Sequence, residues 1–371
     1  MKTTDAADAA WMKAALALAR RGLGQVWPNP AVGCVLVRDD RLVGRGWTQK
    51  GGRPHAETEA LRRAGAAARG AAAYVTLEPC SHHGKTPPCA DALIAAGIAR
   101  VVVACRDPDG RVNGQGIARL QTANIPVSEG VCAAEAEDLN EGFFYRVRRG
   151  RPLVTLKTAA TADGRIATRT GKSQWITGDA ARADVHRLRA EYDAVMVGSA
   201  TVVADDPLLT CRLPGLEGRS PVRIVLDAHL RTPVTAKLVQ TARDVPVWLF
   251  TARASDDPAA KALRAAGLDV IQVGLDGVGQ GVNFRQTFAL LAERGITRVL
   301  VEAGGVLAGA LLGDQLVDRL ELYRAPILLG GDAQAMTGGF NIEDLAQVRR
   351  LDRIAVRTLG PDLVESFRVQ V

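Results

Sequence analysis

The chain has 371 residues, enough for about two domains of ordinary size, each with its own hydrophobic core. No uninterrupted apolar run reaches the roughly 18 residues that a membrane-spanning helix needs, which argues against a membrane protein. The net charge of +7 would suit nucleic acid, but the basic residues are dispersed and aromatic residues make up only 4%. The charge therefore favours small anionic substrates and cofactors, with no nucleic acid as partner.

The first part of the chain, residues 1–147, alternates between helical and strand patterns. A helix is predicted near 8–21, and the apolar runs 31–37 and 41–47, separated by a polar turn, predict a β-hairpin. The patterns that follow are a helix at 55–68, a strand at 73–78, a helix at 90–98, a strand at 100–105, and a further helix with the segment 125–130. This rhythm of strand, helix and strand predicts a layered α/β domain.

The charged segment 141–152 carries Gly150 and Pro152 after a helical pattern, so we predict the domain boundary there. A second α/β domain is predicted over residues 151–371, with a mostly parallel sheet. Its predicted elements are strands at 153–160, 193–198, 222–227, 245–250 and 297–305, helices at 178–192 and 257–267, the apolar run 306–312, and closing strands, expected to be antiparallel, within 321–330 and 362–371.

One histidine and two cysteines in the first domain predict a zinc site. Zinc that activates water needs about three nitrogen or sulfur ligands and one open position, and His55, Cys80 and Cys89 supply them. Glu57, two residues after His55, is placed to move a proton to and from the water. Taken singly, such residues are usually surface histidines or buried thiols, and a purely structural zinc site is the alternative. Three ligands beside Glu57 favour the catalytic interpretation, because structural sites usually have four.

The second domain lacks a G-x-G-x-x-G motif after any predicted strand, so a Rossmann fold is weakly supported. Gly304 and Gly305 end a predicted strand just before a helix, where backbone N–H groups bind phosphate; the alternative is that the glycines only allow tight packing. Lys157 lies within an apolar strand pattern that predicts burial.

Longer motifs resemble a known family. The stretch "EPCSHHGKTPPC" has eight residues between its cysteines, where the usual zinc deaminase signature has two. It is similar to the pyrimidine deaminase of riboflavin biosynthesis, as are "WPNPAVGCVLV", "PHAE", "RDPD" and "EAEDLNEGF". The second half resembles the reductase partner of that enzyme in "LKTAATADGRIAT", "SQWIT", "LRAEYDAVMVGSATVVADDPLLTCR" and "VEAGG". The chain thus resembles the bifunctional diaminohydroxyphosphoribosylaminopyrimidine deaminase and 5-amino-6-(5-phosphoribosylamino)uracil reductase family.

For the first domain the resemblance implies a cytidine deaminase-like α/β/α fold that binds zinc through His55, Cys80 and Cys89. Glu57 would move the proton that lets ammonia leave a phosphoribosylated diaminopyrimidine. The substrate contacts of the family fall on Asn29, His82, Lys85 and Asp107. The family usually has Asn where Asp109 stands, and this added negative charge would be unfavourable near a phosphate unless it points away.

For the second domain the resemblance implies a dihydrofolate reductase-like α/β fold that uses NADPH to reduce the ribosyl to a ribityl chain. The cofactor contacts fall on Ala159, Trp175, Thr201, Asp205, Gly304, Gly305, Val306, Leu307, Ala308, Gly309 and Ala310. The substrate contacts fall on Ser173, Arg189, Leu209, Arg212 and Glu302. Among them, Arg189 and Arg212 would bind phosphate through their forked side chains, although ordinary surface arginines are common. We further hypothesise that Lys157, Asp205 and Glu302 form a catalytic cluster that positions and protonates the opened sugar.

Two further expectations concern the cell and the assembly. Six scattered cysteines without a disulfide framework fit a reducing compartment, so we expect a cytoplasmic enzyme. By resemblance to its relatives we expect a homo-oligomer. The competing hypothesis is a nucleic-acid-binding protein with a zinc site, and a complete reductase-like second half argues against it.

Overall fold

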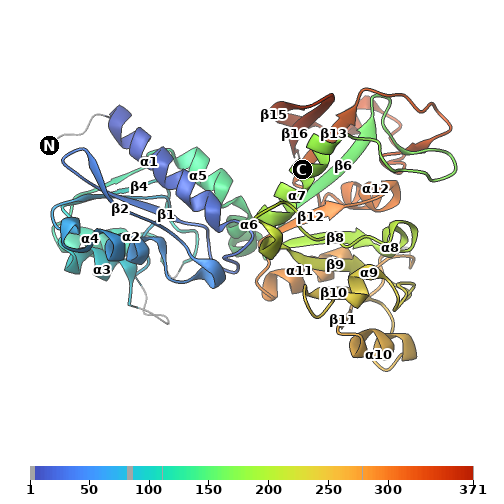
Figure 1. Cartoon of the computed structure of the whole chain (residues 1–371), viewed down its shortest axis with the longest axis horizontal. Coiled ribbons are helices and arrows are strands. Elements are labelled where there is room, and N and C mark those ends of the chain that lie inside the picture. Colours follow the sequence, from blue (N-terminus) through green and yellow to red (C-terminus); the bar gives the residue numbers. More distant parts are fainter. Residues whose placement is uncertain (1–4, 82–86, 111, 278, 371) are drawn as a thin grey trace. The chain divides into compact units, whose positions relative to one another are not determined.

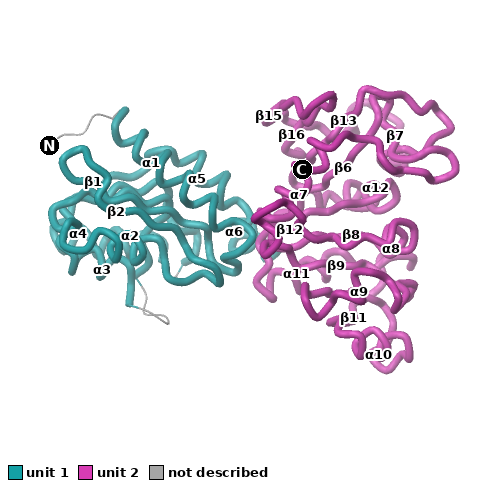
Figure 2. Tube along the Cα trace, in the orientation of Figure 1, with its two compact units in different colours: residues 1–151 teal, residues 152–371 magenta. Residues whose placement is uncertain are grey.

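The computed structural model describes residues 5–81, 87–110, 112–277 and 279–370. The predicted site residues His82 and Lys85 lie outside these ranges. The chain forms two compact units, residues 1–151 and 152–371 (Figure 2). Helix α6 (Glu141–Arg149) ends just before this division at Gly150, whose φ of 64° is a left-handed conformation that favours glycine.

The first unit is built on a five-stranded sheet in the order β2-β1-β3-β4-β5. Its strands are β1 (Gly33–Arg38), β2 (Arg41–Trp47), β3 (Ala72–Val75), β4 (Arg100–Val103) and β5 (Val127–Glu129). Strand β1 pairs antiparallel with both β2 and β3, which confirms the predicted hairpin, and β3, β4 and β5 are parallel. The strands β3 and β4 each end two or three residues before the predicted limits.

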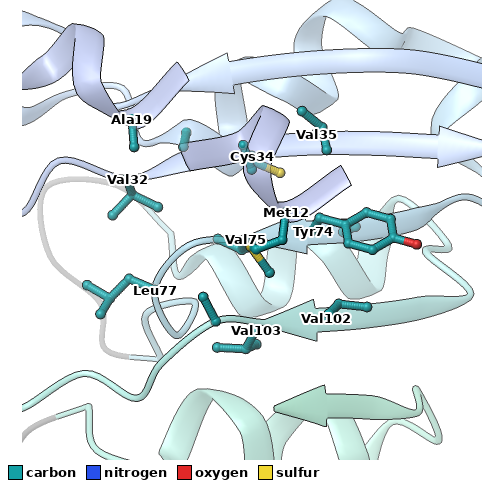
Figure 3. Close-up of a cluster of buried hydrophobic side chains, with 14 of the residues drawn as sticks. Met12, Ala19, Val32, Cys34, Val35, Tyr74, Val75, Leu77, Val102 and Val103 are labelled. Carbon is teal, nitrogen blue, oxygen red and sulfur yellow. The ribbon is translucent and has the colours of Figure 1, made fainter. Parts of the chain in front are cut away.

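Helices cover both faces of this sheet. They are α1 (Asp5–Ala19), α2 (Ala56–Ala64), α3 (Cys89–Ala95), α4 (Gln115–Thr122), α5 (Ala133–Leu139) and α6. Figure 1 shows α1 and α5 on one face and α2 and α3 on the other. Met12 of α1 packs with Cys34, Tyr74 and Val102 of the sheet in a buried core (Figure 3). Helix α1 lies so close to β1 that a Cβ on Gly33 would be 1.9 Å from the Ala15 carbonyl oxygen.

The second unit is built on a nine-stranded sheet in the order β11-β10-β9-β8-β12-β6-β13-β16-β15. Its strands are β6 (Leu153–Thr161), β8 (Ala194–Gly198), β9 (Val222–Leu226), β10 (Val247–Thr251), β11 (Asp269–Gln272), β12 (Arg298–Glu302), β13 (Arg319–Ala325), β15 (Leu351–Leu359) and β16 (Asp362–Val369). The first seven in this order run parallel, whereas β16 is antiparallel to β13 and to β15. This confirms the mostly parallel sheet. Of the two predicted closing strands, β16 is antiparallel as expected, whereas β13 runs parallel to β6 and ends at Ala325. A separate small sheet pairs β7 (Arg165–Ala167) with β14 (Gln334–Ala335).

The helices of the second unit are α7 (Asp179–Glu191), α8 (Ser199–Asp205), α9 (Lys237–Gln240), α10 (Pro258–Ala265), α11 (Phe284–Glu293) and α12 (Gly305–Gly313). Helix α8 begins directly after the carboxyl end of β8, and α12 begins after two further residues at the carboxyl end of β12, the neighbour of β8 in the sheet. Loops and helix starts therefore gather at that edge, which is where parallel sheets usually bind ligands. In the part of the chain that the structure describes, no helix is long and apolar enough to cross a bilayer.

Candidate active sites

Three potential zinc ligands converge in the first unit. His55 is the N-cap of α2, Cys89 is the first residue of α3, and Cys80 lies in the loop between β3 and α3. The His55 Nδ1 atom is 3.3 Å from Cys89 Sγ and 3.7 Å from Cys80 Sγ, and all three ligand atoms lie within 4.8 Å of one another. A tetrahedral zinc ion with bonds of about 2.1 Å to nitrogen and 2.3 Å to sulfur separates its ligand atoms by about 3.6 Å. The donor set and its spacing therefore fit zinc.

The start of α3 stabilises one of the thiols as a thiolate. The hydrogen bonds that Cys80 receives from Cys89, including one of 3.3 Å from the Cys89 backbone N–H, lower the pKa of Cys80 to about 4. The same pairing, together with burial, raises the pKa of Cys89. The helix start that donates to Cys80 begins nine residues after it, at Cys89. Because a thiolate is the form that binds metal, this arrangement prepares Cys80 as a ligand.

Glu57 lies in the first turn of α2 beside the cluster and is only 3% exposed. Burial raises the pKa of its carboxyl to about 7, so it both accepts and donates a proton near neutral pH. A cavity of about 260 Å³ joins Glu57, His55 and Cys80 to the predicted substrate contacts Asn29 and Asp107. Asp109 also lines this cavity, so its charge is part of the site.

Glu78 was missed by sequence reasoning, although it belongs to the "LEPC" motif. Its carboxylate accepts hydrogen bonds from the backbone N–H groups of Gly114, Gly116 and Ile117, at 2.9, 2.9 and 3.3 Å. These bonds fasten the loop that follows Asp107 to the segment that carries Cys80. Glu78 therefore organises the wall of the cavity, a role that depends on partners more than 35 residues away.

The second unit contains a larger cavity, of about 570 Å³. It brings together many of the predicted reductase residues, namely Lys157, Ala159, Ser173, Trp175, Arg189, Thr201, Asp205, Leu209, Arg212, Glu302 and Gly304. The side chains come from β6, α7, α8, β12 and the loops between them. The remaining predicted run, from Gly305 to Ala310, forms most of helix α12.

Arg189 and Glu302 form an ion pair within this cavity. Arg189 Nε and Nη2 donate to the two Glu302 carboxylate oxygens at 2.6 and 2.8 Å, and Nη1 donates to the Thr210 carbonyl at 3.1 Å. Burial by itself would raise the pKa of Glu302, but the charge of Arg189 outweighs burial and lowers this pKa to about 2. The fork of Arg189 is thus already bound to a carboxylate, which corrects the simple view of Arg189 as an open phosphate clamp. Arg212 is exposed to the cavity.

Lys157 and Glu302 are neighbours in the parallel register of β6 and β12. Burial lowers the pKa of the Lys157 ammonium, and the Glu302 charge partly offsets this. Asp205 lies at the end of α8, and burial alone raises its pKa. Of the predicted cluster of three, Lys157 and Glu302 are thus neighbours on adjacent strands, and Asp205 lines the same cavity.

The glycines of α12 and its N-cap differ in what lies around them. A Cβ on Gly305 would be 2.5 Å from the Ala335 carbonyl oxygen, and one on Gly309 would be 2.7 Å from the Gly338 nitrogen. Both glycines therefore allow another segment to pack closely on the helix. Gly304 instead faces open space and lines the cavity, as a close approach of phosphate to the helix start requires.

His186 is a cavity residue that sequence reasoning missed. Its Nδ1 is 3.1 Å from the Thr210 carbonyl oxygen, and its Nε2 is 3.5 Å from Arg212 Nη2. Burial and the charges of Arg189 and Arg212 lower its pKa. The available signal was its position three residues before Arg189, on the same face of the predicted helix.

Comparison with known proteins agrees with these two sites. The family model "RibD C-terminal domain" matches residues 152–364, more than half of the chain, and "Cytidine and deoxycytidylate deaminase zinc-binding region" matches residues 5–105. The chain belongs to the RibD family. The riboflavin biosynthesis protein RibD of Escherichia coli is 44% identical to it, over 96% of this chain and 98% of the relative.

Solved RibD structures share the fold. The RibD of Acinetobacter baumannii (form 1) matches with a TM-score of 0.89 and 40% identity, covering 99% of this chain and 100% of that one. The deaminase/reductase of Thermotoga maritima matches with a TM-score of 0.87 and 35% identity, covering 99% of both chains. The predicted fold class is confirmed: a cytidine deaminase-like domain precedes a RibD reductase domain. The protein is a bifunctional enzyme of riboflavin biosynthesis, a zinc-dependent deaminase joined to a reductase that uses NADPH.

Proposed function

We propose that the first unit deaminates 2,5-diamino-6-(5-phosphoribosylamino)pyrimidin-4-one hydrolytically to 5-amino-6-(5-phosphoribosylamino)uracil, and that the second reduces its ribosyl group with NADPH. The observation that carries the proposal is buried Glu57 beside the His55, Cys80 and Cys89 cluster. The T. maritima protein, described as a deaminase and reductase of this kind of compound, supports the choice of substrate.

In the deaminase site, His55, Cys80 and Cys89 would hold the metal. Bound there, zinc would supply the Lewis acidity that makes a water molecule nucleophilic. Glu57 takes a proton from that water and passes it to the amino group, which leaves as ammonia while the ring carbon gains oxygen. Asn29 and Asp107 line the same cavity and hold the pyrimidine. His82 and Lys85 remain predicted substrate contacts outside the described residues.

Bound in the reductase site, NADPH would supply the hydride that the anomeric carbon of the ribose gains. The Lys157 ammonium donates a proton to the ring oxygen of the ribose as the bond between this oxygen and the anomeric carbon breaks. Burial lowers the pKa of Lys157, and the charge of Glu302 opposes this effect by favouring the protonated form. The other predicted residues divide by role: cofactor binding for Ala159, Trp175, Thr201, Asp205 and the start of α12, and substrate binding for Ser173, Leu209 and Arg212.

The proposal also includes a cytoplasmic location and a homo-oligomeric state. All six cysteines lie in the described residues and none forms a disulfide, which supports a reducing compartment such as the cytoplasm. The homo-oligomer remains a prediction that sedimentation of the purified protein tests.

Removal of the metal tests the proposal at both sites. Protein treated with a chelator should lose ammonia release from the diaminopyrimidine substrate and recover it with added zinc. The same protein should still oxidise NADPH when it is given the deaminated compound directly. If the metal-free protein releases ammonia at the original rate, the proposed deaminase chemistry is wrong.

A further inference from the structure

Arg146 enters the deaminase cavity from helix α6, which the sequence analysis did not connect with the site. Phe143, Arg146 and Val147 all line the cavity, and their spacing of three and four residues places them on one face of the helix. Arg146 is half-buried there, whereas Arg148 and Arg149 of the same helix are exposed. A cationic side chain is thus presented to the cavity beside apolar ones.

Acidic side chains outnumber basic ones around the cavity. Among the described lining residues, the acids are Glu57, Glu78, Asp107 and Asp109, and the arginines are Arg53 and Arg146. The substrate of the proposed function carries a phosphate with a charge of roughly −1.5 to −2 at neutral pH. Such a group would be repelled from this cavity unless it binds next to a cation.

The two arginines belong to different parts of the cavity. Arg53 stands two residues before His55, one of the three potential metal ligands. Arg53 therefore lies at the metal end, where the pyrimidine must lose its amino group. The substrate carries its phosphate on the ribose, away from that amino group. Arg146 comes from α6, an element that contributes none of the metal ligands.

We propose that Arg146 binds the 5′-phosphate of the deaminase substrate. This inference rests on the proposed function and extends it: the deaminase selects a phosphorylated riboside through a residue of α6. A guanidinium suits the task because its planar fork binds two phosphate oxygens at once. Asp109 makes the cation more important in this chain, because it adds a negative charge to the same cavity.

The test compares two substrates that differ only in the phosphate. Arg146→Ala, Arg146→Lys and the control Arg149→Ala are assayed for ammonia release from the phosphoribosyl substrate and from its dephosphorylated riboside. Arg149 is a matched control because it is exposed on the same helix, where its guanidinium lies 4.4 Å from the Tyr145 ring. Zinc content and thermal midpoint are measured for each protein.

Arg146→Ala should lower kcat/KM for the phosphorylated substrate about 10- to 100-fold, mainly through KM. Its kcat/KM for the riboside should stay within about twofold of the wild-type value, because that substrate has no phosphate to lose. For the phosphorylated substrate, the kcat/KM of Arg146→Lys should lie between that of Arg146→Ala and that of the wild type. Arg149→Ala should match the wild type on both substrates. If Arg146→Ala does not fold, inorganic phosphate as a competitor provides the second readout, and Arg146→Lys should weaken its inhibition.

Equal losses of Arg146→Ala on both substrates, or no loss on either, would overturn the proposal. A wild-type protein that deaminates the riboside as well as the phosphorylated compound would also overturn it. Failure of the wild type to deaminate either compound would instead contradict the proposed function itself, and the two failures are therefore distinguishable.

Discussion

Glu302 is held by Arg189 through two hydrogen bonds, of 2.6 and 2.8 Å, and at the same time lies beside Lys157 in the register of β12 and β6. The Arg189 side chain is 11% exposed and that of Glu302 is 14% exposed, so solvent screens the pair only weakly. The pair fixes the carboxylate whose charge acts on the Lys157 ammonium. We propose that Arg189 acts on the reductase as a positioning residue, through Glu302.

Arg189→Lys should lower the reductase kcat about tenfold, because lysine keeps the charge but loses the fork that orients Glu302. The KM for the deaminated substrate should change less. Steady-state kinetics with NADPH at saturation measure both constants. Arg212→Lys provides the contrast: its side chain is exposed to the cavity, so its replacement should mainly raise KM. A large KM effect at Arg189 with kcat unchanged would instead support direct binding of phosphate.

Lys157→Ala should reduce the reductase rate by at least about 100-fold, because it removes the proposed proton donor. Ammonia release should continue at the wild-type rate, since Lys157 belongs to the other unit. NADPH oxidation followed by absorbance measures the first rate. Lys261→Ala, at an exposed position of α10, is the control and should leave both activities unchanged. An unaltered reductase rate in Lys157→Ala would remove this residue from the mechanism.

Glu57→Gln should lower ammonia release by about 100- to 10,000-fold, because the amide cannot carry the proton between water and leaving group. The zinc content should stay the same, since Glu57 is not one of the three clustered ligands. Glu59→Gln, on the same helix, is the control: its carboxylate pairs with Arg62 and Arg63 and should affect stability more than rate. Loss of zinc from Glu57→Gln would show that Glu57 acts on the metal site instead.

Asp184 should make the second unit sensitive to acid. It accepts hydrogen bonds from Arg187, Tyr323 and Arg357, at 2.8, 2.7 and 2.9 Å. Burial by itself would raise the pKa of the Asp184 carboxyl. The hydrogen bonds from Arg357, Arg187 and Tyr323 outweigh burial and lower this pKa to about 2. A carboxyl with a lowered pKa in the folded state stabilises the protein above its unfolded pKa of about 4, and this contribution is lost as the pH falls toward 2.

Asp184→Asn should therefore lower the free energy of unfolding by about 2 kcal/mol at pH 7 and by much less at pH 2. Urea titrations at several pH values measure the difference. Asp332→Asn is the control, because its pair with Arg169 is 3.6 Å long with both side chains more than 70% exposed. A difference between wild type and Asp184→Asn that does not depend on pH would show that the carboxylate charge is not what stabilises this region.

The fold was predictable where the apolar pattern is local. The hairpin of β1 and β2 and the parallel strands β8, β9 and β12 follow directly from short apolar runs. Helix α11 also carries a readable pattern, in Phe284, Phe288 and Leu291, but was not predicted. Strand β15 is different: it is an edge strand with mostly exposed side chains, and its pairing with β16 defines it.

The same distinction applies to the sites. The types and order of the zinc-site residues stand in the sequence, and the structure brings their side chains together. The hydrogen bonds that hold the site residues cannot be read from the sequence. The N–H group that donates to Cys80 comes from Cys89, and the carboxylate that pairs with Arg189 lies 113 residues away in the chain. Composition shows that an arginine is present, but only the folded chain shows which carboxylate holds it.

The central claim is that one chain performs deamination and then reduction. The most direct measurement follows ammonia and NADPH together, with zinc-loaded protein and the phosphoribosylated diaminopyrimidine. We predict that ammonia is released before any NADPH is added, and that NADPH is then oxidised only as the deaminated product accumulates. Oxidation of NADPH without prior ammonia release, or ammonia release with no later oxidation, would contradict the account.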